Sequence, residues 1–473
     1  MLEYNFYFKK AGCFMCEKDK YRIEKDSLGE VLVEKDKLWG AQTQRSLNNF
    51  KIGIEKIPEE VIKALLNIKK SCAQANFSIG KLDKKRYLLI ENAVDEVLNS
   101  KIREHFPLAV WQTGSGTQSN MNVNEVVARI SNNCEGVPGF VHPNDHVNMS
   151  QSSNDVFPSA MKIAALTEIE TKLLPAANKL ADTLKNLEDE NKGIVKVGRT
   201  HLQDAVPIAF SQEISGWRGM IENPVKYIND NLYLLREIAL GATAVGTGLN
   251  SPKGFDEIVS KFLSENLKTS IVPEKNKFHS LTSMDAFVFI HGALKSLASN
   301  LMKIANDIRL LSSGPRCGIG EITIPQNEPG SSIMPGKVNP TQCEAVTMIA
   351  VQVISNDVAV GMAASQGNFQ LNVFMPVCIY NFIQSVRLLS DGMISFEKNC
   401  VRGIKPVKEK MENNLNRNLM SVTALNSVIG YDKSSKIAQK AYREDISIKQ
   451  AALELGFLSE NQIDKILNPY DMI

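Results

Sequence analysis

One eleven-residue stretch, GSSIMPGKVNP (330–340), carries side chains that could remove a proton and hold the charge left behind. It combines two hydroxyls, an ammonium and an amide, from Ser331, Ser332, Lys337 and Asn339. Two glycines permit backbone conformations that other residues resist, and Met334 and Val338 alternate with the polar groups. This pattern predicts a loop that moves and closes over a site, with one polar and one apolar side.

Three other segments are too polar for a core and could bind an anion. GSGTQSNMN (114–122) offers hydroxyls and backbone N–H groups, which suit either a well-satisfied turn or a carboxylate site. SQSSND (150–155) precedes an apolar helical pattern with Pro158 in its first turn; it supplies an N-cap and leaves surplus polar groups where anions are favoured. GRTHLQDAVP (198–207) contains His201, which is structural unless a carboxylate partner tunes its charge.

The composition indicates a soluble globular protein with two or three domains, or one elongated helical body. The chain has 473 residues, of which 43% are hydrophobic and 22% are charged. Its 54 basic and 52 acidic residues nearly balance, so no broad charged surface is expected for nucleic acid or membrane. The N-terminal residues fit neither a secretory signal nor a transit peptide, and we expect a cytoplasmic protein.

Cysteine spacing gives little reason to expect a metal site. Of eight cysteines, only Cys13 and Cys16 form a CxxC pair, and no second CxxC or HxxxH accompanies it. A zinc or redox site needs a second pair or a suitable fold around the first, so chance or a weak accessory role explains this pair. We expect neither a metal nor another cofactor.

Long helices dominate the expected architecture. Apolar residues repeat every three or four positions from Phe287 to Leu311, and similar stripes run over residues 173–187 and 346–364. Rods with this spacing pack at shallow angles into a bundle. Residues 358–386 lack charged side chains, but they contain six Asn and Gln residues that would need partners in lipid. We therefore expect a buried helical core there and not a membrane span.

Strand patterns are few and are confined to the N-terminal segment and to short connectors, such as residues 29–33 and 319–324. The sequence therefore predicts a mainly α protein. Its expected parts are an N-terminal extension (1–20), an N-terminal domain (21–150), a central helical bundle (151–405) and a small C-terminal helical domain (406–473). The last boundary follows from Pro406, which comes shortly after Gly403.

Together these polar segments resemble the fumarase/aspartase superfamily, which is marked by a GSSxMPxKxN loop. The resemblance runs from about Tyr21 to the C-terminus. Within the superfamily, six segments are similar to those of class II fumarases: LWGAQTQRS (38–46), VWQTGSGTQSNMN (110–122), HPNDHVN (142–148), SQSSND (150–155), GRTHLQD (198–204) and GSSIMPGKVNPTQCEA (330–345). Aspartases typically have Gln at the position of His201 and lack the TQCEA continuation that supplies Glu344.

The resemblance implies a three-domain fold whose central bundle of long helices forms the core of a homotetramer. It also implies the reversible hydration of fumarate to L-malate, a reaction of the tricarboxylic acid cycle, in active sites assembled from three chains and without a metal. Two alternatives stay open at this point. One is an aspartate ammonia-lyase, and the other is a non-catalytic relative, which should have lost the catalytic residues.

The same resemblance implies roles for individual residues. Ser331 acts as an alkoxide that removes the proton from carbon, while His201, oriented and charged by Glu344, acts on water or the leaving hydroxyl. The implied substrate-binding residues are Ser115, Gly116, Thr117, Ser152, Ser153, Asn154, Thr200, Ser332, Lys337, Val338 and Asn339. A second dicarboxylate site is implied at His142, Pro143, Asn144 and Asp145. Gly139 and Met149 stand where basic residues are frequent, so we expect weaker anion binding at that second site.

Overall fold

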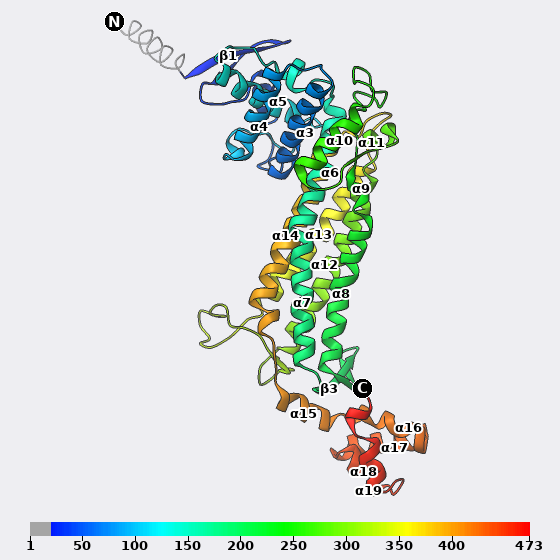
Figure 1. Ribbon diagram of the computed structural model, residues 1–473. Helices are drawn as coiled ribbons and strands as arrows, with labels where there is room; N and C mark the ends of the chain where they lie inside the picture. The colour runs from blue at the N-terminus through cyan, green and yellow to red at the C-terminus, as the bar shows by residue number, and fades with distance from the viewer. Residues whose placement is uncertain (1–19) are drawn as a thin grey trace, which may run out of the picture. The chain divides into compact units, whose positions relative to one another are not determined.

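The computed structural model describes residues 20–473, which divide into two compact units. The first comprises residues 20–172, 228–294 and 354–387, and the second comprises residues 173–227, 295–353 and 388–473. The helices that contribute residues to both units include α12 (Asp285–Leu311), α13 (Thr341–Ala364) and α14 (Met375–Asn399), which Figure 1 labels. The Cys13 and Cys16 pair lies outside the described residues, as does nearly all of the predicted extension 1–20.

The first unit is mainly helical. Its antiparallel hairpin of β1 (Tyr21–Asp26) and β2 (Gly29–Glu34) confirms the strand predicted at residues 29–33. The remaining elements are α2 (Ala41–Asn49), α3 (Glu59–Ser78), α4 (Lys84–Leu98), α5 (Thr117–Glu135), α6 (Ser153–Glu168), α9 (Tyr233–Arg236), α10 (Phe255–Leu267), α11 (Lys277–Thr282) and the parallel pair β5 (Glu237–Ile238) and β6 (Val272–Pro273). Short helical turns lie at Ile102–Glu104, Pro143–Val147 and Ile169–Leu173.

Helix α3 lies at the centre of this unit, where it packs against α4, α6 and α10. Apolar side chains on several of its faces are therefore buried, among them Val61, Leu65 and Ile68. The helix also buries Lys69 completely. Since a buried ammonium must find hydrogen-bond acceptors, this lysine needs polar partners from neighbouring segments.

The parts of α12, α13 and α14 that belong to the first unit are joined by a buried imidazole. His291 on α12 contacts Asp357 Oδ1 on α13 at 3.0 Å through Nδ1, and Ser385 Oγ on α14 at 2.8 Å through Nε2. Beside it, the rings of Phe287 and Phe382 meet edge to face at 5.4 Å. These contacts confirm the long helices predicted from the stripes over residues 287–311 and 346–364.

The second unit contains the other ends of these helices together with the C-terminal helices. Its elements include α7 (Leu174–Glu190), which confirms the stripe at 173–187, and α8 (Phe210–Asn231). Trp217 Nε1 on α8 donates to Asp307 Oδ2 on α12 at 2.9 Å, and Thr183 Oγ1 on α7 donates to Glu397 Oε1 on α14 at 2.8 Å. The bundle is thus held together by buried apolar stripes and by hydrogen bonds between its helices.

Small elements complete the second unit. β7 (Ile322–Thr323) pairs with β8 (Lys405–Pro406), so the strand predicted at 319–324 is only two residues long. The C-terminal helices are α15 (Lys408–Arg417), α16 (Asn426–Ile429), α17 (Tyr431–Glu444), α18 (Ile448–Glu454) and α19 (Glu460–Ile466). Leu425, Ile437 and Ile463 belong to a separate apolar cluster among these helices. The division into three domains at residues 150 and 405 stays a prediction.

One β-hairpin contradicts the expectation that strands are confined to the N-terminal segment and short connectors. β3 (Val195–Thr200) and β4 (Gln203–Ala209) pair antiparallel, with Thr200 opposite Gln203. The turn consists of His201 and Leu202, which are not the Asn-Gly or Asp-Gly pair that marks most two-residue hairpins. The sequence therefore lacks the usual signal for a two-residue turn. The turn nevertheless carries His201, the histidine that the sequence predicts as a site residue.

The uncharged segment 358–386 is not the continuous buried core that its composition predicts. α13 ends at Ala364, α14 begins at Met375, and the residues between them are not helical. In α13, the side chains of Val358 and Met362 are 65% and 61% exposed. Within residues 20–473, α13 is the one helix long and apolar enough to cross a membrane, and 28% of its most apolar window is buried. The chain therefore leaves one apolar face of α13 uncovered.

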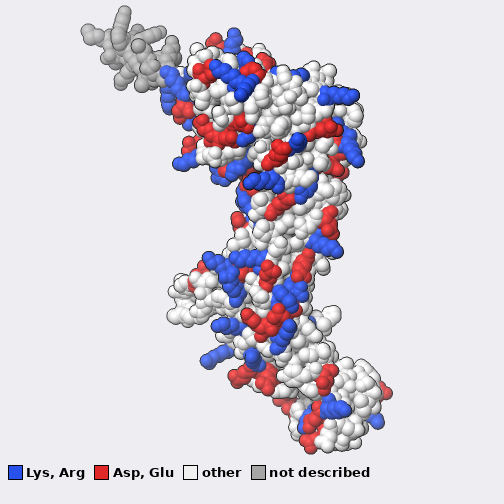
Figure 2. All heavy atoms as spheres, in the orientation of Figure 1, with Lys and Arg blue, Asp and Glu red and all other residues white. Residues whose placement is uncertain are grey.

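Charged side chains of both signs are mixed on the face of the molecule in view in Figure 2. In Figure 2, lysines and arginines are interspersed with aspartates and glutamates. This distribution agrees with the near balance of charges in the sequence. Any selectivity for an anion must therefore come from local groups at a site.

Candidate functional site

Residues 114–117 form a turn that begins helix α5. Gly116 is the N-cap and has a φ of 70°, a left-handed conformation that favours glycine. A Cβ atom at this position would lie 2.3 Å from the ring of Phe157, so no larger residue fits. The turn buries Ser115, whose Oγ lies 2.9 Å from Thr117 Oγ1. Hydroxyls and backbone N–H groups thus lie together at a helix N-terminus, where an anion is favoured.

Residues 152–155 begin helix α6, and they do more than cap it. Ser152 is the N-cap and forms a capping box with Asp155, while Asn154 Nδ2 donates to Ala244 O at 2.9 Å. Asp155 also accepts from the backbone N–H groups of residues 241 and 243, at 3.1 and 2.8 Å. Burial raises the pKa of Asp155 to about 6. Pro158 is the sixth residue of α6 and therefore lies beyond the predicted first turn.

An asparagine joins these two helix N-termini. Asn120 on α5 is fully buried, and its Nδ2 donates to Ser153 Oγ at 2.9 Å. The first unit thus brings together two groups of predicted substrate-binding residues: Ser115, Gly116 and Thr117 with Ser152, Ser153 and Asn154. Two helix N-termini and several hydroxyls in one place favour an anion such as a carboxylate.

The loop with the GSSxMPxKxN pattern lies in the second unit and is closed at its base. Gly330 N donates to Lys337 O at 3.0 Å, and Asn339 Nδ2 donates to Gly330 O. A Cβ atom on Gly330 would lie 2.3 Å from Lys337 O, so the close approach of the two segments requires glycine. These bonds hold both ends of the loop together while its middle residues are exposed.

Two backbone N–H groups point at the hydroxyl of Ser331. Ile333 N and Met334 N donate to Ser331 Oγ at 3.3 and 3.1 Å. Hydrogen bonds of this kind stabilise a negatively charged oxygen more than a neutral one. These two donors therefore reduce the free-energy cost of deprotonating the Ser331 hydroxyl. Lys337 on the same loop is exposed, and among residues 20–473 it has no ion-pair partner.

His201 lies at the exposed turn of the β3–β4 hairpin. Its φ is 57° and that of Leu202 is 60°, so both residues adopt the left-handed conformation. Glu344, in the first turn of α13, is also exposed. Across the described part of the chain, no hydrogen bond or ion pair joins His201 to Glu344. A single chain therefore does not form the predicted His201–Glu344 pair.

Buried charges support the hairpin that carries His201. Arg199 on β3 donates to both carboxylate oxygens of Glu321, at 2.9 and 2.6 Å, and Lys196 Nζ lies 3.3 Å from Glu321 Oε2. Glu321 is fully buried. Although burial alone would raise its pKa, the bonds from Arg199 and the charge of Lys196 hold the pKa below its usual value. The hairpin is thus tied to the segment that leads into the Ser331 loop.

We expect the Glu321→Ala substitution to reduce the free energy of unfolding by about 3–5 kcal/mol, because it removes one partner of a buried ion pair and leaves Arg199 unpaired. A lower Tm in thermal unfolding of the purified protein would show this loss. The matched control is Glu328→Ala, at an exposed position seven residues further along the chain, beyond β7. If both substitutions change the Tm equally, the network around Glu321 does not stabilise the hairpin.

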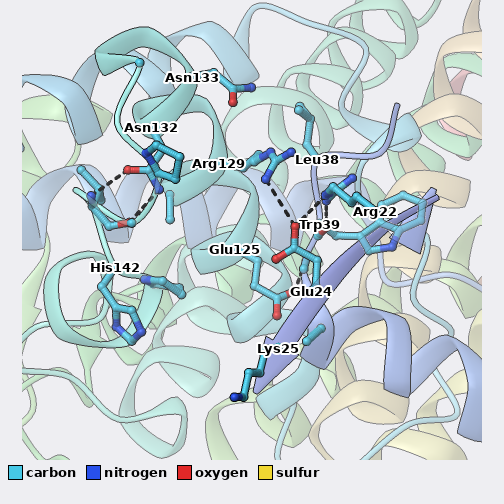
Figure 3. Close-up of a pocket in the computed structure, with 18 residues that line it drawn as sticks. Arg22, Glu24, Lys25, Leu38, Trp39, Glu125, Arg129, Asn132, Asn133 and His142 are labelled. Atoms are coloured by element: carbon cyan, nitrogen blue, oxygen red, sulfur yellow. Dashed lines mark hydrogen bonds and ion pairs between the residues drawn. The ribbon is translucent and has the colours of Figure 1, made fainter. Parts of the chain in front are cut away.

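The residues of the predicted second dicarboxylate site form a short helical turn. His142 precedes the turn Pro143–Val147, and its Nδ1 lies 3.2 Å from both the backbone N and Oδ2 of Asp145. His142 and Gly139 also line a cavity of about 680 Å³. In Figure 3, Glu24 lies between Arg22 and Arg129 in this cavity, with distances of 2.6 and 3.3 Å to their nearest nitrogens. Glu24 pairs with both guanidinium groups but offsets only one of their two positive charges, which weakens the attraction of this cavity for an anion without removing it.

Potential metal ligands are scattered over the described chain. Among residues 20–473, no three His, Cys, Asp or Glu side chains come together in a way that could hold a metal ion. The residues predicted for the active site instead supply hydroxyls, amides, one ammonium, one imidazole and one carboxylate. These groups suit proton transfer and the binding of carboxylates.

Comparisons with known proteins agree with these motifs. Residues 29–355 match the family described as Lyase, and residues 422–473 match the family described as Fumarase C C-terminus. The chain is 56% identical over 455 residues to fumarate hydratase class II of Oceanobacillus iheyensis, covering 96% of this chain and 99% of that one. It is 55% identical over 458 residues to the Campylobacter jejuni protein of the same name, with the same coverage.

A solved structure is similar over the same extent. The crystal structure of recombinant class II fumarase from Schistosoma mansoni matches with a TM-score of 0.94 and 41% identity, and the match covers 96% of this chain and 99% of that one. The Lyase match includes every predicted site residue from Ser115 to Glu344. The mainly α fold with long bundle helices is therefore the fold of these relatives.

Proposed function

The chain belongs to the lyase family of the class II fumarate hydratases, and from this premise we propose how its residues hydrate fumarate reversibly to L-malate. It is a hydro-lyase. The reaction moves a proton at the carbon next to one carboxylate and a hydroxyl at the neighbouring carbon. An aspartate ammonia-lyase is disfavoured because His201 and Glu344 are both present, and a non-catalytic relative is disfavoured because Ser331, Lys337 and Asn339 are present too.

Ser331 is the proposed base at carbon. The observation that carries this assignment is the pair of backbone N–H groups, from Ile333 and Met334, that donate to its Oγ. In dehydration, the Ser331 alkoxide takes the proton from L-malate and leaves a doubly charged, enolate-like carboxylate. Lys337 and Asn339 on the same loop stabilise that charge, and one such preorganised donor is typically worth about 2.7–4 kcal/mol. In hydration, the Ser331 hydroxyl returns the proton to carbon.

His201 acts on the oxygen side of the same reaction. In dehydration it protonates the departing hydroxyl, which leaves as water, and in hydration it takes a proton from the attacking water. Glu344 orients the imidazole and stabilises its charged form. Because both side chains are exposed and unpaired within the described chain, we propose that different subunits supply them to one site.

The substrate carboxylates bind to hydroxyls and backbone N–H groups from several segments. The two helix N-termini of the first unit are suited to this task because their free N–H groups favour anions. The proposed ligands of the carboxylates are Ser115, Gly116, Thr117, Ser152, Ser153, Asn154, Thr200, Ser332 and Val338. At the second dicarboxylate site of His142–Asp145, the charge of Asp145 and the absence of a basic side chain at Gly139 favour weak binding only.

The uncovered face of α13 supports a homotetramer. Its exposed apolar residues recur at a spacing of three, seven and four positions: Met348, Val351, Val358 and Met362, with exposed fractions of 67%, 58%, 65% and 61%. A stripe with this spacing forms the seam between helices in a bundle. We propose that α13 helices from four copies of the chain pack together along this stripe. An apolar stripe of this length is unusual on the surface of a monomer.

We expect the Val358→Asp substitution to break this assembly, because each copy would bury a carboxylate in an apolar seam. Light scattering after size-exclusion chromatography should give a mass near four chains for the wild type and a lower mass for the variant. Val428→Asp is the matched control, since Val428 is similarly exposed at 53% but lies on α16. A variant that keeps the wild-type mass would argue against α13 as the interface.

The reaction itself is tested with purified protein and fumarate. We expect the absorbance of fumarate to fall and L-malate to form, with the same rate when a chelator is present. Ammonium added with fumarate should give no aspartate. Formation of aspartate, or no consumption of fumarate by a correctly folded protein, would overturn the proposed reaction. A cytoplasmic location and a role in the tricarboxylic acid cycle are expectations that follow from this activity.

A further inference from the structure

Lys69 is a buried cation beneath the proposed carboxylate-binding residues. It lies on α3 and is 0% exposed. Its Nζ donates to Asn148 Oδ1 at 2.8 Å and to Gln151 Oε1 at 2.9 Å. No carboxylate of the described chain lies within 4.0 Å of Nζ, and burial lowers the pKa of Lys69 to about 7. Burying an ammonium group costs free energy because the group loses its contact with water. An apolar side chain of similar length would avoid that cost, so packing alone does not account for an ammonium group here.

The ammonium group fixes the direction of a chain of hydrogen bonds. In its ammonium form Lys69 can only donate, so Asn148 must turn its Oδ1 toward Lys69. The same oxygen accepts from Asn120 Nδ2 at 3.2 Å and from Asn124 Nδ2 at 3.3 Å, while Asn148 Nδ2 donates to Gln151 O at 3.2 Å. Lys69 thereby determines which end of each amide faces its neighbour.

The chain of bonds ends at Ser153. Asn120 Nδ2, held by Asn148 Oδ1, also donates to Ser153 Oγ at 2.9 Å. Because Nδ2 can only donate, Ser153 accepts this bond, and its own O–H is left to donate elsewhere. A carboxylate can only accept, so this is the direction that binding a substrate carboxylate requires. If the amide of Asn120 were reversed, the Ser153 hydroxyl would donate to Asn120 and turn its lone pairs toward the substrate.

We propose that Lys69 is a positioning residue that holds Ser153 as a hydrogen-bond donor to the substrate carboxylate, acting through Asn148 and Asn120. The inference rests on the proposed function, since it takes Ser153 as a ligand of the substrate. Lys69 itself does not touch the substrate. Its role is to fix hydrogen-bond direction across α3, the segment 148–151, α5 and the start of α6.

The test compares Lys69→Met with Lys70→Met in the full chain. Lys70 is the next residue of α3, but its Nζ pairs with Asp95 at 2.8 Å on the outside of the unit. We measure KM and kcat for fumarate and the inhibition constant of succinate, a dicarboxylate that does not react. Lys69→Met should raise KM and the inhibition constant by about 10- to 100-fold, the equivalent of one hydrogen bond to a charged group, and change kcat much less. Lys70→Met should leave all three within about twofold.

A double variant at Lys69 and Ser153 shows whether Lys69 positions Ser153 or has only a general structural role. In a Ser153→Ala background, Lys69→Met should cause almost no further rise in KM, because the hydroxyl that it positions is already gone. The proposal would be overturned if the increase in KM of the double variant equalled the product of the increases in the two single variants. It would also be overturned by a Lys69→Met variant that folds and binds succinate normally. Failure of the wild type to hydrate fumarate would instead overturn the proposed function.

If Lys69→Met does not fold, a second variant tests the direction of the hydrogen bond between residue 120 and Ser153. Asn120→Asp keeps the shape of the side chain but replaces the donor to Ser153 with an acceptor. It should raise KM and the succinate inhibition constant by a similar factor, since the Ser153 hydroxyl would then donate to position 120. Unchanged constants in this variant would show that the direction of the bond at Ser153 does not matter, and would contradict the role of Lys69.

Discussion

The Ser331→Ala substitution is expected to reduce the kcat of fumarate hydration by about 10²- to 10⁴-fold, the range that a positioned general acid or base contributes. The reason is that alanine removes the oxygen that exchanges a proton with carbon, while Lys337 and Asn339 still bind the substrate. KM should therefore change less than kcat. The measurement is the initial rate of fumarate absorbance loss, at several fumarate concentrations, with the purified protein.

The matched control for this experiment is Ser427→Ala. Ser427 is exposed, and its Oγ donates to Ala424 O within the C-terminal helices, outside any proposed site segment. Its kcat should equal that of the wild type. If Ser331→Ala retains a kcat within about threefold of wild type while its mass and Tm are unchanged, then Ser331 is not the base at carbon.

The His201→Asn substitution is expected to lower kcat by a similar factor, about 10²- to 10⁴-fold, and to alter the dependence of the rate on pH. Asparagine tolerates the left-handed backbone conformation that position 201 adopts, so the hairpin turn should persist. What is lost is the group that moves a proton on the oxygen side. The measurement is kcat and kcat/KM as a function of pH for both proteins.

Leu202→Asn is the control for the turn itself. Leu202 shares the left-handed conformation and is 72% exposed, but it has no proposed contact with the substrate. This variant should keep the wild-type kcat and pH profile. An unchanged pH–rate profile in His201→Asn, with kcat near the wild-type value, would remove His201 from the mechanism.

The sequence predicts which chemical groups form the candidate site better than it predicts their burial and their contacts with distant residues. Ser331, Lys337 and Asn339 stand out because hydroxyl, ammonium and amide groups rarely share a short loop with two glycines. The long helices stand out as well, because apolar stripes with a period near 3.6 extend over several turns, as from Phe287 to Leu311. Both kinds of signal are local in the chain.

Features that depend on distant contacts could not be predicted in this way. Lys69 and Lys70 are neighbours of the same type, yet only Lys69 is buried, and its partner Asn148 is 79 residues away. The α13 helix is apolar around much of its circumference, so the sequence does not show that Val358 is exposed in the single chain. The β3–β4 hairpin was missed because its turn residues carry no common turn signal.

The claim that Ser331 and His201 have separate duties is tested most directly by hydrogen exchange into L-malate in D₂O, followed by proton NMR together with fumarate formation. The account predicts that His201→Asn still exchanges the proton at the carbon that loses it, faster than it forms fumarate, because Ser331 works without the departure of hydroxide. Ser331→Ala should neither exchange this proton nor form fumarate at a significant rate. Exchange at the wild-type rate in Ser331→Ala would contradict the account.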